Sequence, residues 1–314
     1  MAMAIDQTQG GLTYGTFGLG IHGSGPGSVV QQVHDGDTVN VRAIGNFSVR
    51  FLGIDTPEVS FTLPGSTQFR SISDASWDVF LSNPFAANLP PLQLDAALKA
   101  NLISRLGAGT AANHAAHAGN AHRALEQEIQ NDIAARGLAK EDVQFFAAFA
   151  REIVDRYGRL LAWLNISDQS ATRPADYNTR MLQGGVATPY FIFPNIDPWR
   201  SQGPLLQAIK APALFRQEAN APGKLRDARN AIAEARANGD GIFATSGPLR
   251  IHPFELRFLA QRRAPDRWVV DLGANDSTLL KPQNYHTVAN VEDRLFVPED
   301  YVPLFVQAGW QRQP

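Results

Sequence analysis

Apolar and polar residues alternate most clearly near the start of the chain. Residues 39–43 alternate strictly, with the period of two that is typical of a half-buried β-strand. The Gly-Asn pair at 45–46 is a turn signal, and residues 49–54 are apolar on both faces, as expected of a central returning strand. The Thr-Pro pair at 56–57 ends this strand because proline cannot donate to a ladder. A short apolar run at 29–33 predicts one more strand, so three strands are expected here.

Helical periodicity dominates the middle of the chain. Apolar residues at a spacing of four predict a helix over 111–136, and Gly137 is a stop signal. The segment 143–153 is apolar enough for a helix or a strand, and its pattern does not separate the two. Further helices are predicted at 95–106, 177–185, 225–237 and 298–306. Further strands are predicted at 160–166, 190–193 and 268–272.

The composition is that of an ordinary globular protein: 44% of the 314 residues are hydrophobic and 18% are charged. No stretch approaches the roughly eighteen consecutive apolar residues of a membrane span. No cysteine occurs, which excludes disulfides, thiolate metal sites and cysteine nucleophiles. No secretory signal is readable, which predicts the cytoplasm and leaves export by another route open.

The formal net charge of −2 changes the picture of possible partners. Proteins that grip long nucleic acids through phosphates usually have a basic excess or a basic face. The charge therefore argues against tight, non-specific binding of long duplexes. A small phosphate-binding site built from a few arginines remains compatible with it.

Charged residues gather at the ends of the first predicted strands. Asp37, Asp55 and Glu58 are hard oxygen donors, the ligand type that suits Ca²⁺ or Mg²⁺. Arg50 and, much later in the chain, Arg159 carry planar guanidinium groups that match phosphate oxygens. Phosphodiester hydrolysis needs a metal ion, a base for water and cations for the charge that develops at phosphorus.

Three sequence blocks carry these residues. They begin at Val33, Val49 and Asp155 and are V-x-D-G-D-T-V, V-R-F-L-G-I-D-T-P-E and D-R-Y-G-R-L-L-A-W-L. Each block alone is a weak signal, but three in this order are specific. Together they resemble the staphylococcal (micrococcal) nuclease family, also called thermonucleases. The resemblance covers residues 28–58 and 118–245.

The resemblance implies an α+β fold with a five-stranded OB-type β-barrel and helices, a scaffold often used for nucleic acids. The barrel domain would span residues 28–245, with a large insertion at about 59–117. A flexible Gly-rich leader over 1–27 would precede it. A C-terminal extension of unknown function, residues 246–314, would follow it.

The resemblance also implies a calcium site and a general base. Asp37 and Asp55 would be the carboxylate ligands of Ca²⁺, and the backbone carbonyl of Thr56 would be a further ligand. Glu58 would activate or orient the attacking water. The expected reaction is therefore metal-assisted attack of water on a phosphodiester.

The same resemblance assigns residues to the substrate. Arg50 would bind the scissile phosphate, and Arg159 would stabilise the transition state and the leaving group. The remaining candidates would line the nucleotide pocket, and they are Arg156, Tyr157 and Tyr190, with Phe191 as an alternative to Tyr190.

Three hypotheses follow for function. The first is a calcium-dependent nuclease acting on DNA or RNA, with single-stranded or small substrates favoured by the low net charge. The second is a non-catalytic module that binds nucleic acid or protein with the same barrel. The third is a latent nuclease closed by the insertion at 59–117. Relatives that only bind normally lose the carboxylates and arginines, and their presence here favours the enzyme.

Two further groups of residues have simpler interpretations. His114, His117 and His122 lie in an Ala-rich segment and are expected on a solvated helix rather than at a metal site. Trp268 and Trp310 are expected to be core residues of the C-terminal segment rather than binding platforms.

Overall fold

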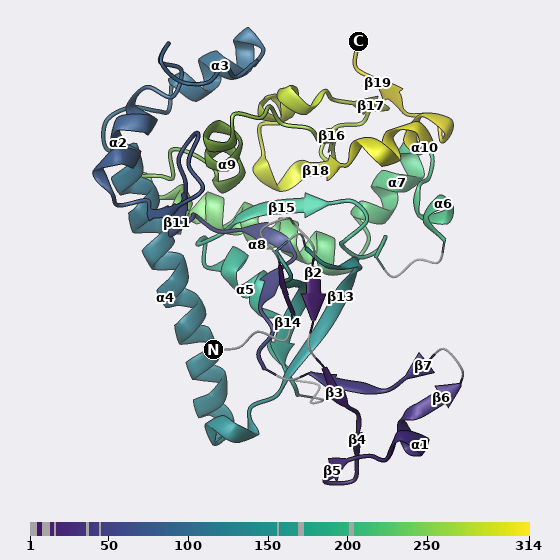
Figure 1. Ribbon diagram of the computed structural model, residues 1–314. Helices are drawn as coiled ribbons and strands as arrows, with labels where there is room; N and C mark the ends of the chain where they lie inside the picture. Colours follow the sequence, from purple (N-terminus) through teal and green to yellow (C-terminus); the bar gives the residue numbers. More distant parts are fainter. Residues whose placement is uncertain are drawn as a thin grey trace. The chain divides into compact units, whose positions relative to one another are not determined.

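The computed structural model describes residues 5–7, 13–15, 17–35, 38–43, 45–155, 157–168, 173–200 and 204–314 (Figure 1). The chain divides into two compact units. The first comprises residues 1–51 and 148–162, and the second comprises residues 52–147 and 163–314. Each unit is described by itself below.

The first unit consists of short strands. Its elements are β1 (Ile5–Gln7), β2 (Thr13–Gly15), β3 (Phe17–Leu19), β4 (Ile21–His22), β5 (Gly25–Pro26), α1 (Val29–Gln32), β6 (Val33–Asp35), β7 (Thr38–Val39), β8 (Val41–Ala43), β9 (Val49–Phe51), most of β13 (Phe145–Val154) and the start of β14 (Leu160–Ile166). Strands β1 and β2, β3 and β8, β4 and β5, and β6 and β7 pair antiparallel, whereas β9 pairs parallel with β14.

The helix α1 corrects the strand predicted at 29–33. The Ser28 hydroxyl accepts from the backbone N–H of Gln31 (3.4 Å), and the Gln31 side-chain oxygen accepts from the backbone N–H of Ser28 (2.9 Å). This reciprocal capping box satisfies two backbone donors and begins a single helical turn. The prediction was wrong because a short apolar run has no period that separates a helix from a strand.

The second unit is built around a mixed sheet in the order β10-β15-β18-β16. Its elements are β10 (Gly53–Asp55), β11 (Ser60–Thr62), β12 (Phe69–Ser71), α2 (Ala75–Ser82), α3 (Ala96–Ile103), α4 (Thr110–Arg136), η1 (Lys140–Asp142), α5 (Tyr177–Gln183), β15 (Thr188–Ile192), α6 (Leu205–Ala208), α7 (Pro212–Ala219), α8 (Lys224–Asn238), η2 (Gly241–Phe243), α9 (Pro253–Gln261), β16 (Trp268–Asp271), β17 (Thr278–Leu279), η3 (Pro282–Thr287), η4 (Val291–Asp293), β18 (Arg294–Val297), η5 (Glu299–Tyr301), α10 (Val302–Gln307) and β19 (Gln311–Arg312). Residues 246–314 thus supply two of the four strands of this sheet.

The α+β class is confirmed: both units contain strands, and the second contains most of the helices. In the part of the chain that the structure describes, no sheet closes into a barrel. Within the same described ranges, no helix combines the length and the hydropathy needed to cross a membrane.

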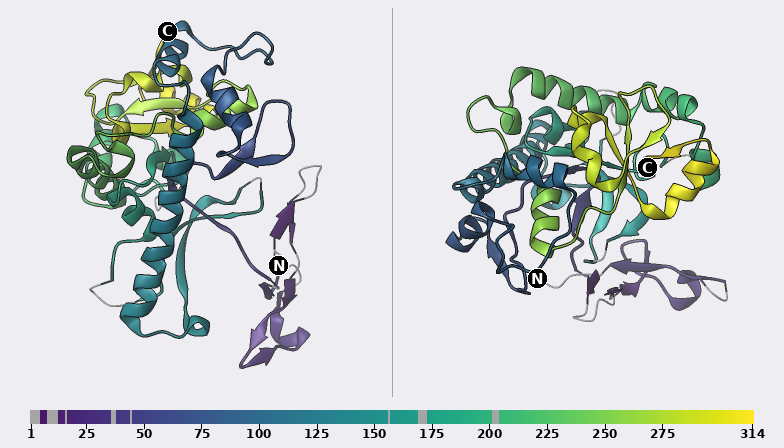
Figure 2. Two further views of the ribbon diagram at one scale, coloured as in Figure 1. Left: turned by 90° about the vertical axis from the view of Figure 1, so that its left-hand side faces the viewer. Right: turned by 90° about the horizontal axis from the view of Figure 1, so that it is seen from above.

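Most of the expected elements of the second unit are present. The helices predicted at 111–136, 177–185 and 225–237 are confirmed as α4, α5 and α8. Of the undecided segment 143–153, residues 145–153 lie in the strand β13, most of which belongs to the first unit. The strand predicted at 160–166 has those bounds in β14. Figure 2 shows α4 as one uninterrupted helix, in agreement with its 27 residues.

The two faces of the four-stranded sheet carry different helices. Tyr190, Ile192 and Phe296 share one face by the period of two, and they pack in one hydrophobic cluster with Leu256 and Leu259 of α9. Helix α8 contacts β15 from the other face and packs along α5 (Figures 1 and 2). The sheet therefore separates α9, which packs on the face of Tyr190, from α5 and α8 on the opposite face.

The predicted insertion, residues 59–117, is part of the hydrophobic core of the second unit. Trp77, Leu81, Leu98 and Leu102 have exposed fractions of 0% and belong to the same cluster as α9. The insertion is therefore not a surface excursion, because its apolar residues are buried against the C-terminal segment.

Of the two tryptophans predicted to be core residues, only Trp310 is fully buried. Trp310 is buried, and its ring lies 5.5 Å from that of Phe215 and 5.7 Å from that of Phe305. Trp268 at the start of β16 is only half-buried and donates its indole N–H to Glu299. Trp310 is the core residue of the C-terminal segment.

Gly53 in β10 is a position that only glycine fits. Its φ is +73°, and a Cβ atom there would lie 2.7 Å from Cη2 of the buried Trp163. We expect Gly53→Ala to lower the free energy of unfolding by about 2–3 kcal/mol, because it combines a left-handed backbone with overpacking. Gly65 has nearly the same φ, +75°, but open space around it.

Gly65→Ala is therefore the matched control, with an expected loss of about 1 kcal/mol from the backbone alone. Urea denaturation followed by tryptophan fluorescence measures the free energy of unfolding of both variants. Equal losses in the two variants would mean that the contact with Trp163 contributes nothing.

Candidate functional site

The predicted site residues divide between the two units. Arg50, Tyr157 and Arg159 belong to the first unit, whereas Asp55, Thr56, Glu58 and Tyr190 belong to the second. Asp37 and Arg156 lie outside the described residues. Each half of the predicted site is described separately.

In the first unit one arginine lies on a strand and the other directly before the neighbouring strand. Arg50 of β9 is the register partner of Leu161 in the parallel strand β14, and Leu160 donates its N–H to the Ser48 carbonyl at 2.8 Å. Arg159 immediately precedes β14 and lies two residues before Leu161. Because side chains two residues apart share a face of a strand, Arg50 and Arg159 are expected on the same face.

Asp155 holds Arg159 in place, a role that the sequence did not predict. Its carboxylate accepts from the backbone N–H groups of Tyr157 (2.8 Å) and Arg159 (3.0 Å) and from Nε of Arg159 (2.8 Å). Arg159 Nη2 lies 2.6 Å from the same carboxylate. Gly158, at φ +78°, lets the chain make this tight turn. The motif D-R-Y-G-R already contained this signal, because an Asp followed three residues later by a Gly favours such a turn.

Tyr157 lies against this turn. Its ring is 43% exposed, and the guanidinium carbon of Arg159 lies 5.1 Å from the ring centre, within cation–π range. Tyr157 and Arg159 therefore form one surface of the first unit, an aromatic ring beside a positive charge.

In the second unit the structure brings Asp55 and Glu58 together through a residue from much later in the chain. Arg257 of α9 donates to both carboxylate oxygens of Asp55, at 2.9 and 2.7 Å, and to Oε1 of Glu58 at 2.6 Å. The Asp55 side chain is 2% exposed, and that of Glu58 is 23% exposed. One guanidinium thus bridges the two carboxylates that the sequence predicted for metal binding and catalysis.

The backbone around the two carboxylates is fixed by polar contacts. Thr188 of β15 donates its hydroxyl to the Asp55 carbonyl at 2.9 Å. His114 of α4 accepts the backbone N–H of Glu58 at its Nε2, at 2.8 Å. Proline follows Thr56 and ends β10, as predicted. The carboxylates therefore project from a rigid strand end rather than from a loose loop.

The solvated-helix prediction is wrong for His114 and His117. Their exposed fractions are 0% and 8%, and His117 Nε2 lies 3.0 Å from the Gly247 carbonyl. Only His122, with a side chain that is 64% exposed, lies as predicted. The Ala-rich sequence suggested exposure, but small side chains instead let α4 approach its neighbours closely.

Burial shifts the pKa values of the groups around the carboxylates. Desolvation lowers the pKa of His114 to about 4, so this imidazole is neutral and can accept from Glu58 at neutral pH. Burial would also lower the pKa of Arg257, but the charges and hydrogen bonds of Asp55, followed by the charge of Glu58, raise it above its usual value. The bridge is consequently a full ion pair.

Tyr190 lies on the same side of the sheet as Arg257. Its ring stacks on Phe254 at 5.5 Å between centroids, with an interplanar angle of 16°, and packs against Phe296. Its hydroxyl accepts from Arg267 at 2.6 Å. The Tyr190 ring is thus packed against the protein's own aromatic residues. Its only polar group, the hydroxyl, is hydrogen-bonded to Arg267.

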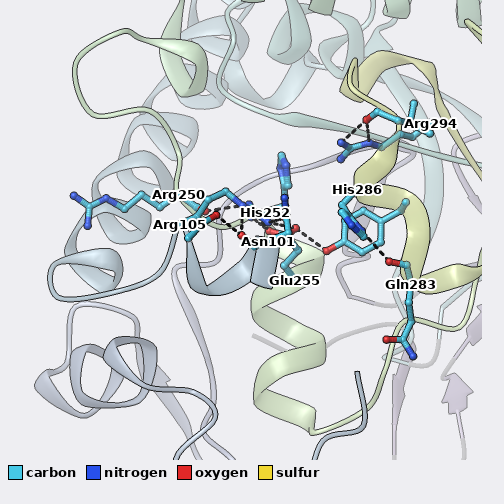
Figure 3. Close-up of polar contacts among 11 residues, drawn as sticks. Asn101, Arg105, Arg250, His252, Glu255, Gln283, His286 and Arg294 are labelled. Atoms are coloured by element: carbon cyan, nitrogen blue, oxygen red, sulfur yellow. Dashed lines mark hydrogen bonds and ion pairs between the residues drawn. The ribbon is translucent and has the colours of Figure 1, made fainter. Parts of the chain in front are cut away.

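A second buried carboxylate lies on α9, close to Arg257 in sequence. Glu255 accepts from Arg105 at 2.7 and 2.9 Å, from the Tyr285 hydroxyl at 2.7 Å and from the backbone N–H of His252 at 2.8 Å. Figure 3 shows Arg105 and His252 gathered around Glu255. Every oxygen of this carboxylate is hydrogen-bonded, so the cluster anchors α9 and fixes the position from which Arg257 reaches Asp55.

Arg257, Arg267 and Glu255 were not predicted from the sequence. The available signal was the composition of α9, in which one Glu and one Arg stand among apolar residues, P-F-E-L-R-F-L-A. Charged residues on an otherwise buried helix need partners, because an unpaired buried charge is costly. The signal shows that partners exist but not which ones.

The oxygen donors suit calcium in type, but their present arrangement does not fit the ion. Calcium takes six to eight oxygen ligands, and Arg257 engages both oxygens of Asp55 and one of Glu58. Among the residues with a described position, no group of three or more acidic or histidine side chains is arranged to hold a metal. Calcium would need Arg257 to leave the carboxylates.

No known family model, curated protein or solved structure matches this chain. The resemblance to the staphylococcal nuclease family therefore stays a prediction that rests on its three sequence blocks.

Proposed function

We propose that this chain is a nuclease that hydrolyses phosphodiester bonds of DNA or RNA by attack of water. The observation that supports it most is the register of β9 and β14, which sets Arg50 beside Leu161, two residues after Arg159. Two guanidinium groups on one face match a phosphate and the negative charge that develops during its hydrolysis. Asp155 orients the second of them.

The proposal gives the two carboxylates different roles. Glu58, with about a quarter of its side chain exposed, is reachable by water and is the proposed general base. Asp55 is buried and positions the charges around it. The proposal includes the OB-type barrel predicted from the resemblance, and it retains DNA or RNA in single-stranded or short form as the substrate.

The calcium requirement remains a prediction with a condition attached. Asp55 and the Thr56 carbonyl would be the ligands from the described part of the site. The carboxylate of Asp55 becomes available to an ion only when Arg257 no longer engages both of its oxygens.

The test is hydrolysis of single-stranded DNA and RNA with calcium, with magnesium and with a chelator. We expect Glu58→Gln and Arg159→Ala each to lower the rate about a hundredfold or more, because each removes one group that acts in the transition state. Arg226→Ala, at an exposed position of α8, is the matched control and should retain the rate.

Two outcomes would contradict the proposal. Unchanged cleavage in both site variants would assign the activity to another site or to a contaminant. Binding of nucleic acid without cleavage under any metal condition would favour a non-catalytic binding module.

A further inference from the structure

Arg257 is held in place by the fold rather than by the carboxylates alone. It lies on α9 between Leu256 and Phe258, which are buried in the cluster that also contains Trp77 of α2. The same helix is anchored through Glu255, two residues before Arg257. The guanidinium therefore projects from a firmly packed helix, α9, which lies within the C-terminal segment.

The three hydrogen bonds of Arg257 place a positive charge where a cation is needed. Asp55 is almost fully buried, and two neighbouring carboxylates cannot stay ionised in such an environment without a compensating charge. Arg257 supplies this charge, and its fork matches both oxygens of Asp55. A divalent ion bound to Asp55, beside Glu58, would supply the same compensation.

We propose that Arg257 is a built-in counter-ion that competes with a divalent cation for Asp55. While the guanidinium bridges the two carboxylates, both oxygens of Asp55 are engaged and are not available to a metal ion. This inference rests on the proposed function, since it concerns the regulation of the same site. The element that closes the site would then lie in the C-terminal segment, whereas the sequence pointed to the insertion at 59–117.

Competition has a specific thermodynamic consequence. The free energy of cation binding is the free energy of the cation's own contacts minus that of the ion pairs that it displaces. Removing the guanidinium removes that cost and leaves a buried site of net negative charge. The affinity for calcium should then rise, although no ligand has been added.

The experiment is isothermal titration calorimetry of calcium into the full chain and into Arg257→Gln. We expect Arg257→Gln to bind calcium at least about tenfold more tightly than the unmodified chain, which corresponds to about 1.4 kcal/mol. Arg263→Gln is the matched control, because Arg263 is exposed just beyond the same helix, and its affinity should equal that of the unmodified chain. Equal affinity in folded Arg257→Gln and the unmodified chain would overturn the inference.

A folding defect in Arg257→Gln would itself be informative. Calcium that binds the native state raises the thermal midpoint, so calcium should raise that of Arg257→Gln by more than that of the unmodified chain. If the variant does not fold even with calcium, Arg257→Lys replaces it. Lysine keeps one charge but lacks the planar fork; an affinity no higher than that of the unmodified chain would then count against competition.

The outcomes separate this inference from the proposed function. Tighter calcium binding without hydrolysis in any variant supports the competition and contradicts the nuclease. Hydrolysis that depends on Glu58, with identical calcium affinity in both proteins, supports the nuclease and contradicts the competition.

Discussion

Arg257→Gln is expected to lower the free energy of unfolding by about 3–5 kcal/mol, measured in the absence of calcium. Removing one partner of a buried ion pair leaves the other charge uncompensated, and this is the cost that such variants show. Asp55 is 2% exposed and loses both of its guanidinium hydrogen bonds, so solvent replaces little of the interaction. Glu58 is more exposed and contributes less to the loss.

The double variant Asp55→Asn/Arg257→Gln provides the test of this cause. It has no buried charge at Asp55, so we expect it to recover about half or more of the lost stability. Urea denaturation followed by tryptophan fluorescence gives the three values, with Arg263→Gln as the surface control. If the double variant is no more stable than Arg257→Gln, packing of the arginine stem explains the loss instead.

Glu255→Gln is expected to lower the free energy of unfolding by about 3 kcal/mol at neutral pH. The difference between the variant and the unmodified chain should become smaller in acid. Burial raises the pKa of Glu255, but two groups outweigh it and lower the pKa to about 2. They are His252, whose own pKa burial lowers to about 4 so that it is charged only in acid, and then Arg105, through its charge and hydrogen bonds. A carboxyl whose pKa is lower in the folded state stabilises the protein fully above its unfolded pKa. That contribution is lost as the pH falls towards the folded pKa.

The pH window follows from these two values. The unfolded value is 4.5, so the contribution of Glu255 should be complete above about pH 5.5. About 2 kcal/mol of it should be lost by about pH 3, from the difference between the two titration curves. Glutamine does not titrate, so chemical denaturation of both proteins across this range isolates the effect. A stability difference that stays constant with pH would contradict the low pKa.

Much of the secondary structure could be predicted from the sequence because its signals are local. The stripe in 111–136 and the glycine after it define α4, and the charged and apolar alternation in 225–237 defines α8. The segment 29–33 was predicted incorrectly, because four or five residues do not establish a period, whereas the contact between Ser28 and Gln31 decides the helix.

The site could be predicted only in part, and the division has a physical basis. Asp55, Glu58 and Asp155 lie at strand ends and turns that local sequence specifies, so their positions follow from motifs. Whether their charges are compensated depends on residues from distant parts of the sequence that pack against them. Arg257 is about two hundred residues from Asp55 in the chain, and no local pattern connects the two.

The sequence by itself determined the chemical inventory of this protein: two carboxylates after a strand, two arginines near strand ends, and an apolar helix with one Glu and one Arg. These are properties of residue type and short-range spacing, which propensity and turn chemistry express directly. Only the tertiary structure decided that the arginine of α9 bridges Asp55 and Glu58 and that His114 is buried beneath Glu58. Burial and charge pairing arise when distant segments exclude water together, so they belong to the folded chain as a whole.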